Sequence, residues 1–320
     1  MTYNNCSLFK NIGQIMLRIA ACIPLCLLSF YAQASQLGAK VESEIRFDDR
    51  SQKPQRYQYR VRVYPHVMLD EDQYWSVNAF AVTGEEFSSS HNTLDDGTGD
   101  HFYLRRLYLR YEKGQNKTEF GVIPTYKGRV SSTGLSKDGF IAGIRQVVGM
   151  QNGRFEVVVG DLDTTQAEEA FADINELNYA EVEYSSSFDG PLNYEISADR
   201  VLQQNFVRGE LRYEGNKQTT YAFELINRLD TSAKKIVLSV ETEFNLFNQT
   251  AEVFSYYAYV NDEFGQRTAL IEDFLATGHG VAFELKSRFN DEWPIEWFTK
   301  FEAYESNTRV QFGLKYGFSL

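Results

Sequence analysis

The last residues of the chain, Thr308–Leu320, read TRVQFGLKYGFSL and alternate between two kinds of side chain. One set is apolar or aromatic throughout: Val310, Phe312, Leu314, Tyr316, Phe318 and Leu320. The other set is polar or small: Arg309, Gln311, Gly313, Lys315, Gly317 and Ser319. A period of two residues is typical of a β-strand, because successive side chains of a strand point to opposite faces. The segment is therefore predicted to be a strand with one apolar face and one face in water.

The same alternation continues through most of the chain. It is clearest in Arg56–Leu69, Ile236–Leu246 and Val281–Phe289, where apolar or aromatic residues share one face and charged residues share the other. No long run recurs at helical spacing, and the best short candidate, Gln166–Ile174, lies between two strand segments. The chain is therefore predicted to be all-β.

Two classes of connection separate these segments. Short polar turns are predicted at Leu69–Gln73, Glu112–Lys117, Gln151–Gly153, Phe188–Pro191, Glu214–Lys217, Phe247–Gln249 and Asn290–Pro294. Longer connections mostly alternate with them, at Gly84–Asp100, Pro124–Asp138, Leu162–Asn175 and Asn261–Thr277. Short periplasmic turns and longer outer loops are typical of a transmembrane antiparallel β-barrel. The spacing predicts about 16 strands of about ten residues, with about 14 as the alternative because the outer connections near Asn205 and Ser306 are very short.

A soluble β-sandwich is the alternative architecture, since its strands would also alternate. Its apolar face would point into a core, where Val, Ile and Leu dominate and a buried tyrosine needs a hydrogen-bond partner. Here tyrosines lie on the apolar face near the segment ends, at Tyr57, Tyr111, Tyr184, Tyr213, Tyr257 and Tyr259. Tyrosine rings at headgroup level form the girdles of membrane barrels, so the pattern favours a barrel in lipid.

The N-terminal residues carry a different signal. A basic start precedes the apolar run Ile19–Phe30, and Ala32–Ala34 (AQA) follows it. This order is typical of a cleaved signal peptide, here predicted over residues 1–34, because the apolar run is too short to cross a membrane. A lipoprotein cleavage box at Ile19–Cys22 is the alternative. All three cysteines precede residue 35, so residues 35–320 are predicted to form one barrel domain without disulfides.

Composition excludes several classes of protein. The chain has 320 residues with 32 Lys+Arg against 44 Asp+Glu, a pI near 5.0 and a mean hydropathy of −0.40. A nucleic-acid binder would need a basic face, so no nucleic-acid partner is expected. A helical membrane protein would need repeated runs of about 20 apolar residues, which this chain lacks.

Two segments carry a resemblance to a known family. Thr308–Leu320 resembles the last strand of Gram-negative outer-membrane proteins, although Leu320 stands where that strand usually ends in Phe. Leu104–Pro124 (LRRLYLRYEKGQNKTEFGVIP) adds a strand–turn–strand with arginines on its polar face. On these features residues 35–320 resemble a bacterial porin. The resemblance implies an outer-membrane, water-filled channel for passive diffusion of small hydrophilic solutes or ions.

The same resemblance implies the partners of the chain. They are outer-membrane lipid, the barrel-assembly machinery acting through Thr308–Leu320, and two further copies in a homotrimer. No cofactor and no metal are expected.

The two-residue alternation along each strand predicts which charged side chains point into the water-filled interior. The predicted pore-lining residues are Arg60, Arg62, Arg106, Arg110, Arg208, Arg212, Glu181, Glu183, Glu241 and Glu243. The arginines concentrate in the second and fourth segments and the acidic residues in later ones, so a closed barrel would set them on opposite walls. Charge clusters of this kind decide ion selectivity in channels.

The resemblance also implies an acidic loop that narrows the pore opposite an arginine wall. Leu162–Asn175 is the segment predicted for this role, because it carries Asp163, Glu168, Glu169 and Asp173. The alternative is that the interior charges only solvate one another.

An outer-membrane barrel enzyme of protease or lipase type and a structural or adhesin barrel remain alternative functions. His91 and His101 flank the Gly/Asp-rich segment Asp95–Asp100, but its spacing matches no calcium loop. No Ser/His/Asp cluster can be assigned from spacing alone, and the HExxH and CxxC motifs are absent. No catalytic residue is therefore predicted.

Overall fold

The computed structural model describes most of the chain after the predicted signal peptide. The described residues are 36–94, 97, 99–125, 135–162, 165–174, 176–188, 190–216, 218–265, 267, 270, 277–290, 292–305 and 307–320. The signal peptide predicted over residues 1–34 lies outside them. Among these residues no helix is long and apolar enough to cross a membrane.

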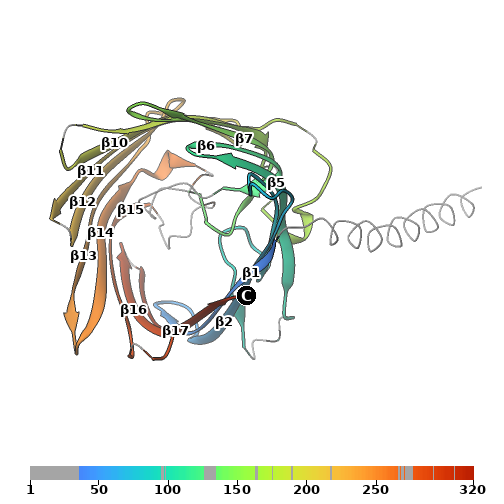
Figure 1. The fold of residues 1–320 in the computed structure, drawn as a ribbon. Helices are drawn as coiled ribbons and strands as arrows, with labels where there is room; N and C mark the ends of the chain where they lie inside the picture. Colours follow the sequence, from blue (N-terminus) through green and yellow to red (C-terminus); the bar gives the residue numbers. More distant parts are fainter. Residues whose placement is uncertain are drawn as a thin grey trace, which may run out of the picture.

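The described residues form one antiparallel sheet that closes on itself. Of its 17 strands, 16 make the barrel wall and the remaining one, β4, has two residues and pairs only with β2. The strands are β1 (Gln36–Arg50), β2 (Arg56–Met68), β3 (Trp75–Thr83), β4 (Asn92–Thr93), β5 (Phe102–Lys113), β6 (Asn116–Pro124), β7 (Phe140–Met150), β8 (Gly153–Asp161), β9 (Tyr179–Ser187), β10 (Leu192–Val201), β11 (Gln204–Asn216), β12 (Thr219–Arg228), β13 (Lys234–Leu246), β14 (Gln249–Val260), β15 (Gly278–Arg288), β16 (Ile295–Tyr304) and β17 (Asn307–Ser319). The all-β barrel prediction is confirmed, with the larger of the two predicted strand counts (Figure 1).

The first and last strands close the ring. β1 pairs with β2 on one side and with β17 on the other, in continuous register from Lys40–Ser319 to Arg50–Arg309. Every wall strand therefore has a neighbour on both sides, and no row of backbone N–H and C=O groups is left at an edge. The segment Thr308–Leu320, which alternates most regularly in the sequence, lies almost entirely in the strand that completes the barrel.

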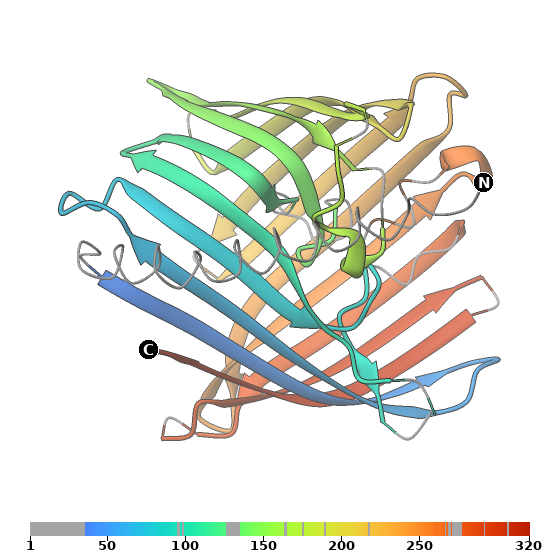
Figure 2. The ribbon, with the colours of Figure 1, turned by 90° about the vertical axis from the view of Figure 1, so that its right-hand side faces the viewer.

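The connections fall into the two classes that the sequence predicts. Short turns join β2–β3, β5–β6, β7–β8, β9–β10, β11–β12, β13–β14 and β15–β16, and they lie at the end of the barrel where β1 begins and β17 ends (Figure 2). The longer connections β3–β5, β6–β7, β8–β9 and β14–β15 lie at the other end. The helical candidate Gln166–Ile174 contains only the 3-10 helix η1 (Ala167–Glu169), and a second one, η2 (Asp262–Phe264), lies in the β14–β15 connection.

The two faces of the sheet have opposite chemistry. On the outer face Ile45, Leu238 and Phe312 are 58%, 50% and 52% exposed. On the inner face Arg145 and Glu224 are 2% and 1% exposed. A soluble sandwich would bury the first set and expose the second, so this distribution excludes that alternative.

The buried apolar cluster lies on the inner face, towards the end of the long connections. It includes Ile123, Val158, Phe206, Ile226, Val237 and Tyr256 from the wall strands. Leu135 of the β6–β7 connection and Phe264 and Leu270 of the β14–β15 connection pack into it. The described parts of these two connections therefore fold into the barrel instead of projecting from its rim.

Candidate functional site

The β3–β5 connection places the side chains of Ser90 and His91 on the inner wall. Arg105 of β5 holds the start of this connection: it is fully buried, and its guanidinium donates to the backbone oxygens of Gly84 and Glu86, both at 2.9 Å. The turn at Gly84 needs glycine, because its φ of 76° lies in the left-handed region and a Cβ there would meet the Ser90 carbonyl carbon at 2.8 Å. The connection then returns to the wall as β4 and carries Ser90 and His91 inward.

We define the arginine sector as Arg60, Arg62 and Arg106 with their partners Glu44 and Asp138. Arg62 Nη2 lies 2.6 Å from the Asp138 carboxylate, and Arg60 Nη1 lies 3.8 Å from it. Arg106 donates to the backbone oxygens of Gly139, at 2.7 Å, and of Lys137. The segment Leu135–Gly139 of the β6–β7 connection is thus held on the inner wall by the side chain of Asp138 and by two backbone carbonyls.

Asp138 and His91 lie outside the wall strands, and both are electrostatically perturbed. Burial raises the pKa of Asp138, but Arg62 and Arg60 outweigh it and hold that pKa well below its ordinary value. Burial, reinforced by nearby Arg46 and Arg60, lowers the pKa of His91 well below its ordinary value. His91 Nε2 lies 2.9 Å from Glu44 Oε1, so a neutral imidazole donates to a carboxylate there.

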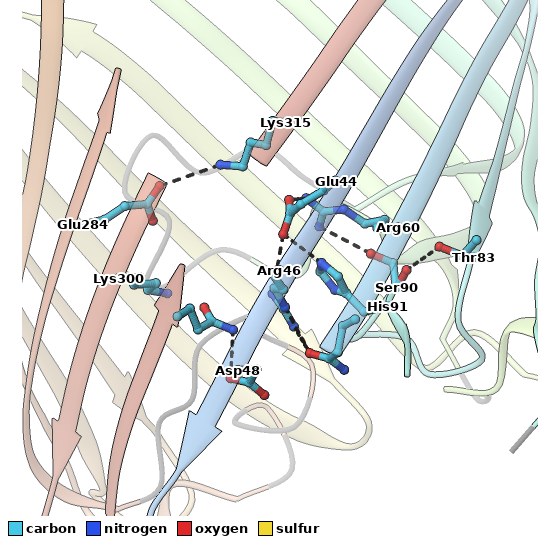
Figure 3. Close-up of polar contacts among 12 residues, drawn as sticks. Glu44, Arg46, Asp48, Arg60, Thr83, Ser90, His91, Glu284, Lys300 and Lys315 are labelled. Carbon is cyan, nitrogen blue, oxygen red and sulfur yellow. Dashed lines mark hydrogen bonds and ion pairs between the residues drawn. The ribbon is translucent and has the colours of Figure 1, made fainter. Parts of the chain in front are cut away.

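Figure 3 shows how the sector continues towards β17. Arg60 reaches Glu44, and Arg46 donates to Gln58 at 2.9 and 3.0 Å. On the adjoining part of the wall, Lys315 of β17 reaches Glu284 of β15 at 3.9 Å. Charges from β1, β2, β15 and β17 therefore share one inner surface.

A ladder of alternating charge extends the arginine sector along β5 to β8. Arg110 and Arg145 both bind Glu119, at 2.7 and 2.6 Å. Arg145 also binds Glu156 at 2.7 Å. Each charge therefore has a partner of opposite sign on a neighbouring strand.

We define the acidic sector as Arg208 and the carboxylates around it on β9 to β12. Among the described residues, Arg208 contacts Glu183 at 3.5 Å, Glu210 at 3.0 Å, and Glu195 and Glu224 at shorter distances. Glu181 and Asp199 lie on the same face of β9 and β10. The sector therefore has an excess of negative charge around one central guanidinium.

The two sectors face one another across the barrel. β10, β11 and β12 lie on one side of the ring, and β1, β2 and β5 lie on the other (Figure 1). Positive and negative excess on opposite walls produces a field across the interior. The predicted lining residues of this part of the wall, Arg60, Arg62, Arg106, Arg110, Arg208, Arg212, Glu181 and Glu183, are distributed over these two sectors and the ladder between them.

Glu241 and Glu243 are placed elsewhere. They share a face of β13 with buried Lys235 and Val237, but they lie towards the short turn and are exposed. They are therefore separate from both sectors, near the end of the barrel where the chain begins.

The structure differs from the prediction for the narrowing loop. The described part of the β8–β9 connection lies outside the wall beside β5, where Ala167 N–H donates to Glu85 O at 2.7 Å (Figures 1 and 2). Glu168, Glu169 and Asp173 are exposed there, and Asp163 lies outside the described residues. The acidic loop residue that meets the arginines is Asp138, because its connection leaves the sheet at β6, next to the arginines of β5.

Several inner-wall charges were missed in the sequence. They include Arg46, Asp48, Glu119, Asp138, Arg145, Arg267 and Arg309. The parity of β1, β6, β7 and β17 would have found five of them. Asp138 and Arg267 lie in connections, where no parity rule applies.

The histidine-flanked segment shows no catalytic arrangement in its described part. His91 contacts Glu44, and His101 contacts Tyr103 Oη at 3.1 Å and Glu85 at 3.4 Å. Asp95 and Asp96 lie outside the described residues. Within the described ranges, no group of His, Cys, Asp and Glu side chains is arranged to hold a metal ion.

Comparisons with known proteins agree with the fold. No protein-family model and no curated protein matches the sequence. A triple mutant of a Rhodopseudomonas blastica porin superposes with a TM-score of 0.64 at 10% sequence identity, over 88% of this chain and 100% of that chain. A fivefold mutant of the same porin superposes with a TM-score of 0.63 at 9% identity, with the same coverage. The chain therefore has the barrel fold seen in a bacterial porin.

Proposed function

We propose that this chain forms a water-filled channel in a bacterial outer membrane, through which small hydrophilic solutes or ions diffuse passively. One observation carries the proposal: the sheet is closed, exposes large apolar side chains outward and holds its charges inward. An apolar outer face suits lipid, and a closed sheet leaves no unpaired backbone edge in hydrocarbon. The fold shared with a porin supports the same function.

In this proposal the two charged sectors act as the filter. An ion that passes between them meets a positive excess on one wall and a negative excess on the other. Charged groups that line a pore select permeating ions by their sign and position. The channel needs no catalytic residue, and we propose that the chain is not an enzyme.

Export of the chain and its assembly in the outer membrane belong to the same proposal. Export would use the predicted signal peptide, residues 1–34, and assembly machinery would recognise Thr308–Leu320. The pairing of β17 with β1 supports this role for the C-terminal strand, because the barrel cannot close without it. A homotrimer is proposed on the resemblance to porins.

The decisive experiment is electrical. Residues 35–320, refolded in detergent and added to a planar lipid bilayer, should produce stepwise increases of conductance. A bilayer that stays silent, with protein whose β-sheet content shows that it is folded, would contradict the channel and favour the barrel enzyme or the adhesin.

A paired substitution tests contact with lipid. Leu238 on β13 faces outward, and the next residue, Ser239, faces inward. Leu238→Arg should lower the free energy of unfolding in lipid vesicles by about 2–4 kcal/mol, since it places a charge in hydrocarbon. Ser239→Arg should leave that free energy close to wild type, and equal losses would contradict the assigned faces.

A further inference from the structure

Two connections from distant parts of the ring meet inside the barrel. Ser136 lies between β6 and β7, and Leu270 lies between β14 and β15. The Ser136 N–H donates to the Leu270 oxygen at 2.7 Å. Both side chains are buried, at 1% and 0% exposure, so the contact lies within packed structure and not at a rim.

Arg267 fixes the β14–β15 connection to the acidic sector. Its guanidinium pairs with the Asp199 carboxylate on β10 and lies over the Phe206 ring on β11, 5.3 Å from the ring centroid. Asp199 and Phe206 are paired in register, so one small area of the wall holds both contacts. Phe264 of the same connection packs on Phe206 at 5.4 Å between ring centroids.

The β6–β7 connection is fixed to the opposite wall by the inverse arrangement. There the loop supplies a carboxylate, Asp138, and the wall supplies Arg60 and Arg62. Each connection thus carries the charge opposite to the excess on the wall that it reaches. A buried ion pair adds little net stability, because both charges lose their hydration. We therefore assign these two pairs the role of fixing the position of each segment on its wall.

We propose that the described residues Asn261–Gly265, Arg267 and Leu270 of the β14–β15 connection are a second narrowing element of the pore and that Arg267 is the residue that positions it. With Leu135–Gly139 they form one bar across the barrel, joined at Ser136 and Leu270. Arg267 also cancels the charge of Asp199, so it limits the preference of the acidic sector for cations. This inference rests on the proposed channel function, because width and selectivity have meaning only for a conducting pore.

Substitutions at the two ends of the ion pair separate position from charge. Arg267→Gln and Asp199→Asn should both raise single-channel conductance, because either one releases the connection from the wall. Arg267→Gln should also raise the K⁺:Cl⁻ permeability ratio about twofold at about 0.1 M salt, the combined effect on both ions of one unit charge acting through about 8 Å of water with a Debye length of about 10 Å. Asp199→Asn should change that ratio in the opposite direction, because it removes one negative charge from the acidic sector and keeps the positive charge of Arg267.

Arg200→Gln is the matched control for these variants. Arg200 is the next residue on β10 but is exposed on the outer face, so neither conductance nor selectivity should change. Unchanged conductance and selectivity in Arg267→Gln would overturn the proposal.

A cross-linking experiment tests the bar without any electrical measurement. The described part of the chain has no cysteine, so Ser136→Cys/Leu270→Cys introduces a unique pair. A short bifunctional thiol reagent should join that pair in the folded barrel and change its mobility after denaturation. The pair Ser136→Cys/Leu229→Cys should not be joined, because Leu229 lies exposed on the β12–β13 connection.

The two experiments distinguish the two proposals. A wild-type barrel that is silent in bilayers, together with a Ser136→Cys/Leu270→Cys variant that does cross-link, would overturn the channel and keep the bar. A conducting wild type, together with a double-cysteine variant that does not cross-link and an Arg267→Gln variant whose conductance and selectivity are unchanged, would overturn the bar and keep the channel.

Discussion

The arginine sector and the acidic sector neutralise their charge in different ways. In the arginine sector Arg106 donates to backbone oxygens and Asp138 is shared between Arg60 and Arg62, so the loss of one contact leaves others in place. In the acidic sector four glutamates share the Arg208 guanidinium, and Glu210 also contacts Arg212 at 3.4 Å. The comparison indicates that the contacts of the positive wall are redundant, whereas the contacts of the negative wall are concentrated on Arg208.

Removal of the Arg208 guanidinium should therefore have the largest effect on the free energy of unfolding. Arg208→Met should lower the free energy of unfolding by about 3–5 kcal/mol, because it removes the cation that four buried carboxylates share. Arg62→Met should cost about 1–3 kcal/mol, since Asp138 keeps Arg60 and the Ser90 hydroxyl. Urea titrations of both variants in lipid vesicles measure the difference.

A variant in the same cluster serves as control for Arg208→Met. Glu210→Gln keeps the side-chain shape and removes one of several like charges, so it should stay within about 1 kcal/mol of wild type. Equal losses for Arg208→Met and Arg62→Met would show that the two walls do not differ in redundancy.

The next largest effect on stability concerns Asp138, the residue of the arginine sector that lies in the β6–β7 connection. Asp138→Asn should lower the free energy of unfolding by about 1–3 kcal/mol, because Arg62 and Arg60 lose the carboxylate that they share while Ser90 keeps an acceptor. It should also speed cleavage by trypsin after Lys137, which the ion pair otherwise holds against the wall. Asp173→Asn, in the exposed connection outside the wall, should change neither quantity. If both variants behave alike, Asp138 does not anchor the segment.

Substitutions in the two sectors should change ion selectivity in opposite directions. Replacing Arg60, Arg62, Arg106 and Arg110 by Gln should raise the K⁺:Cl⁻ permeability ratio by about fivefold at low salt, because several partly compensated positive charges are lost. Replacing Glu181 and Glu183 by Gln should lower the ratio by about twofold. Both shifts should shrink as salt rises, since the Debye length falls to about 3 Å at 1 M. Shifts in the same direction would contradict a field across the pore.

The fold was predictable because a barrel wall is a local pattern repeated many times. Leu238 and Ser239 show it in two residues: one faces out, the next faces in, and neighbouring strands repeat the choice. The short turns were predictable for a similar reason, because polar residues interrupt the alternation. The lining position of Arg62 or Glu183 follows from the same parity.

The loops were not predictable, because their placement depends on contacts between distant residues. Acidic composition favoured Leu162–Asn175 as the narrowing segment, but that connection pairs with Glu85 and remains outside the wall. Asp138 is a single acidic residue in an unremarkable connection, and it becomes important only because Arg62 lies beside it in the closed ring. The pairing of Arg267 with Asp199 requires a loop to cross several strands, and no local signal encodes that path.

The smallest effect is a pH dependence that belongs to the arginine sector. Because burial and the neighbouring arginines lower the pKa of His91, the folded barrel leaves this histidine neutral under conditions in which the unfolded chain protonates it. Unfolded histidine takes up its proton near pH 6.5, so the free energy of unfolding should fall as pH drops below that value, and by about 1 kcal/mol at pH 5.5. His91→Gln keeps a donor for Glu44 but cannot titrate, so it should remove this part of the loss. Thermal unfolding of both proteins in detergent at pH 7.5 and 5.5 measures it. If wild type and His91→Gln lose the same stability between the two pH values, burial and the neighbouring arginines do not hold His91 neutral in the folded barrel.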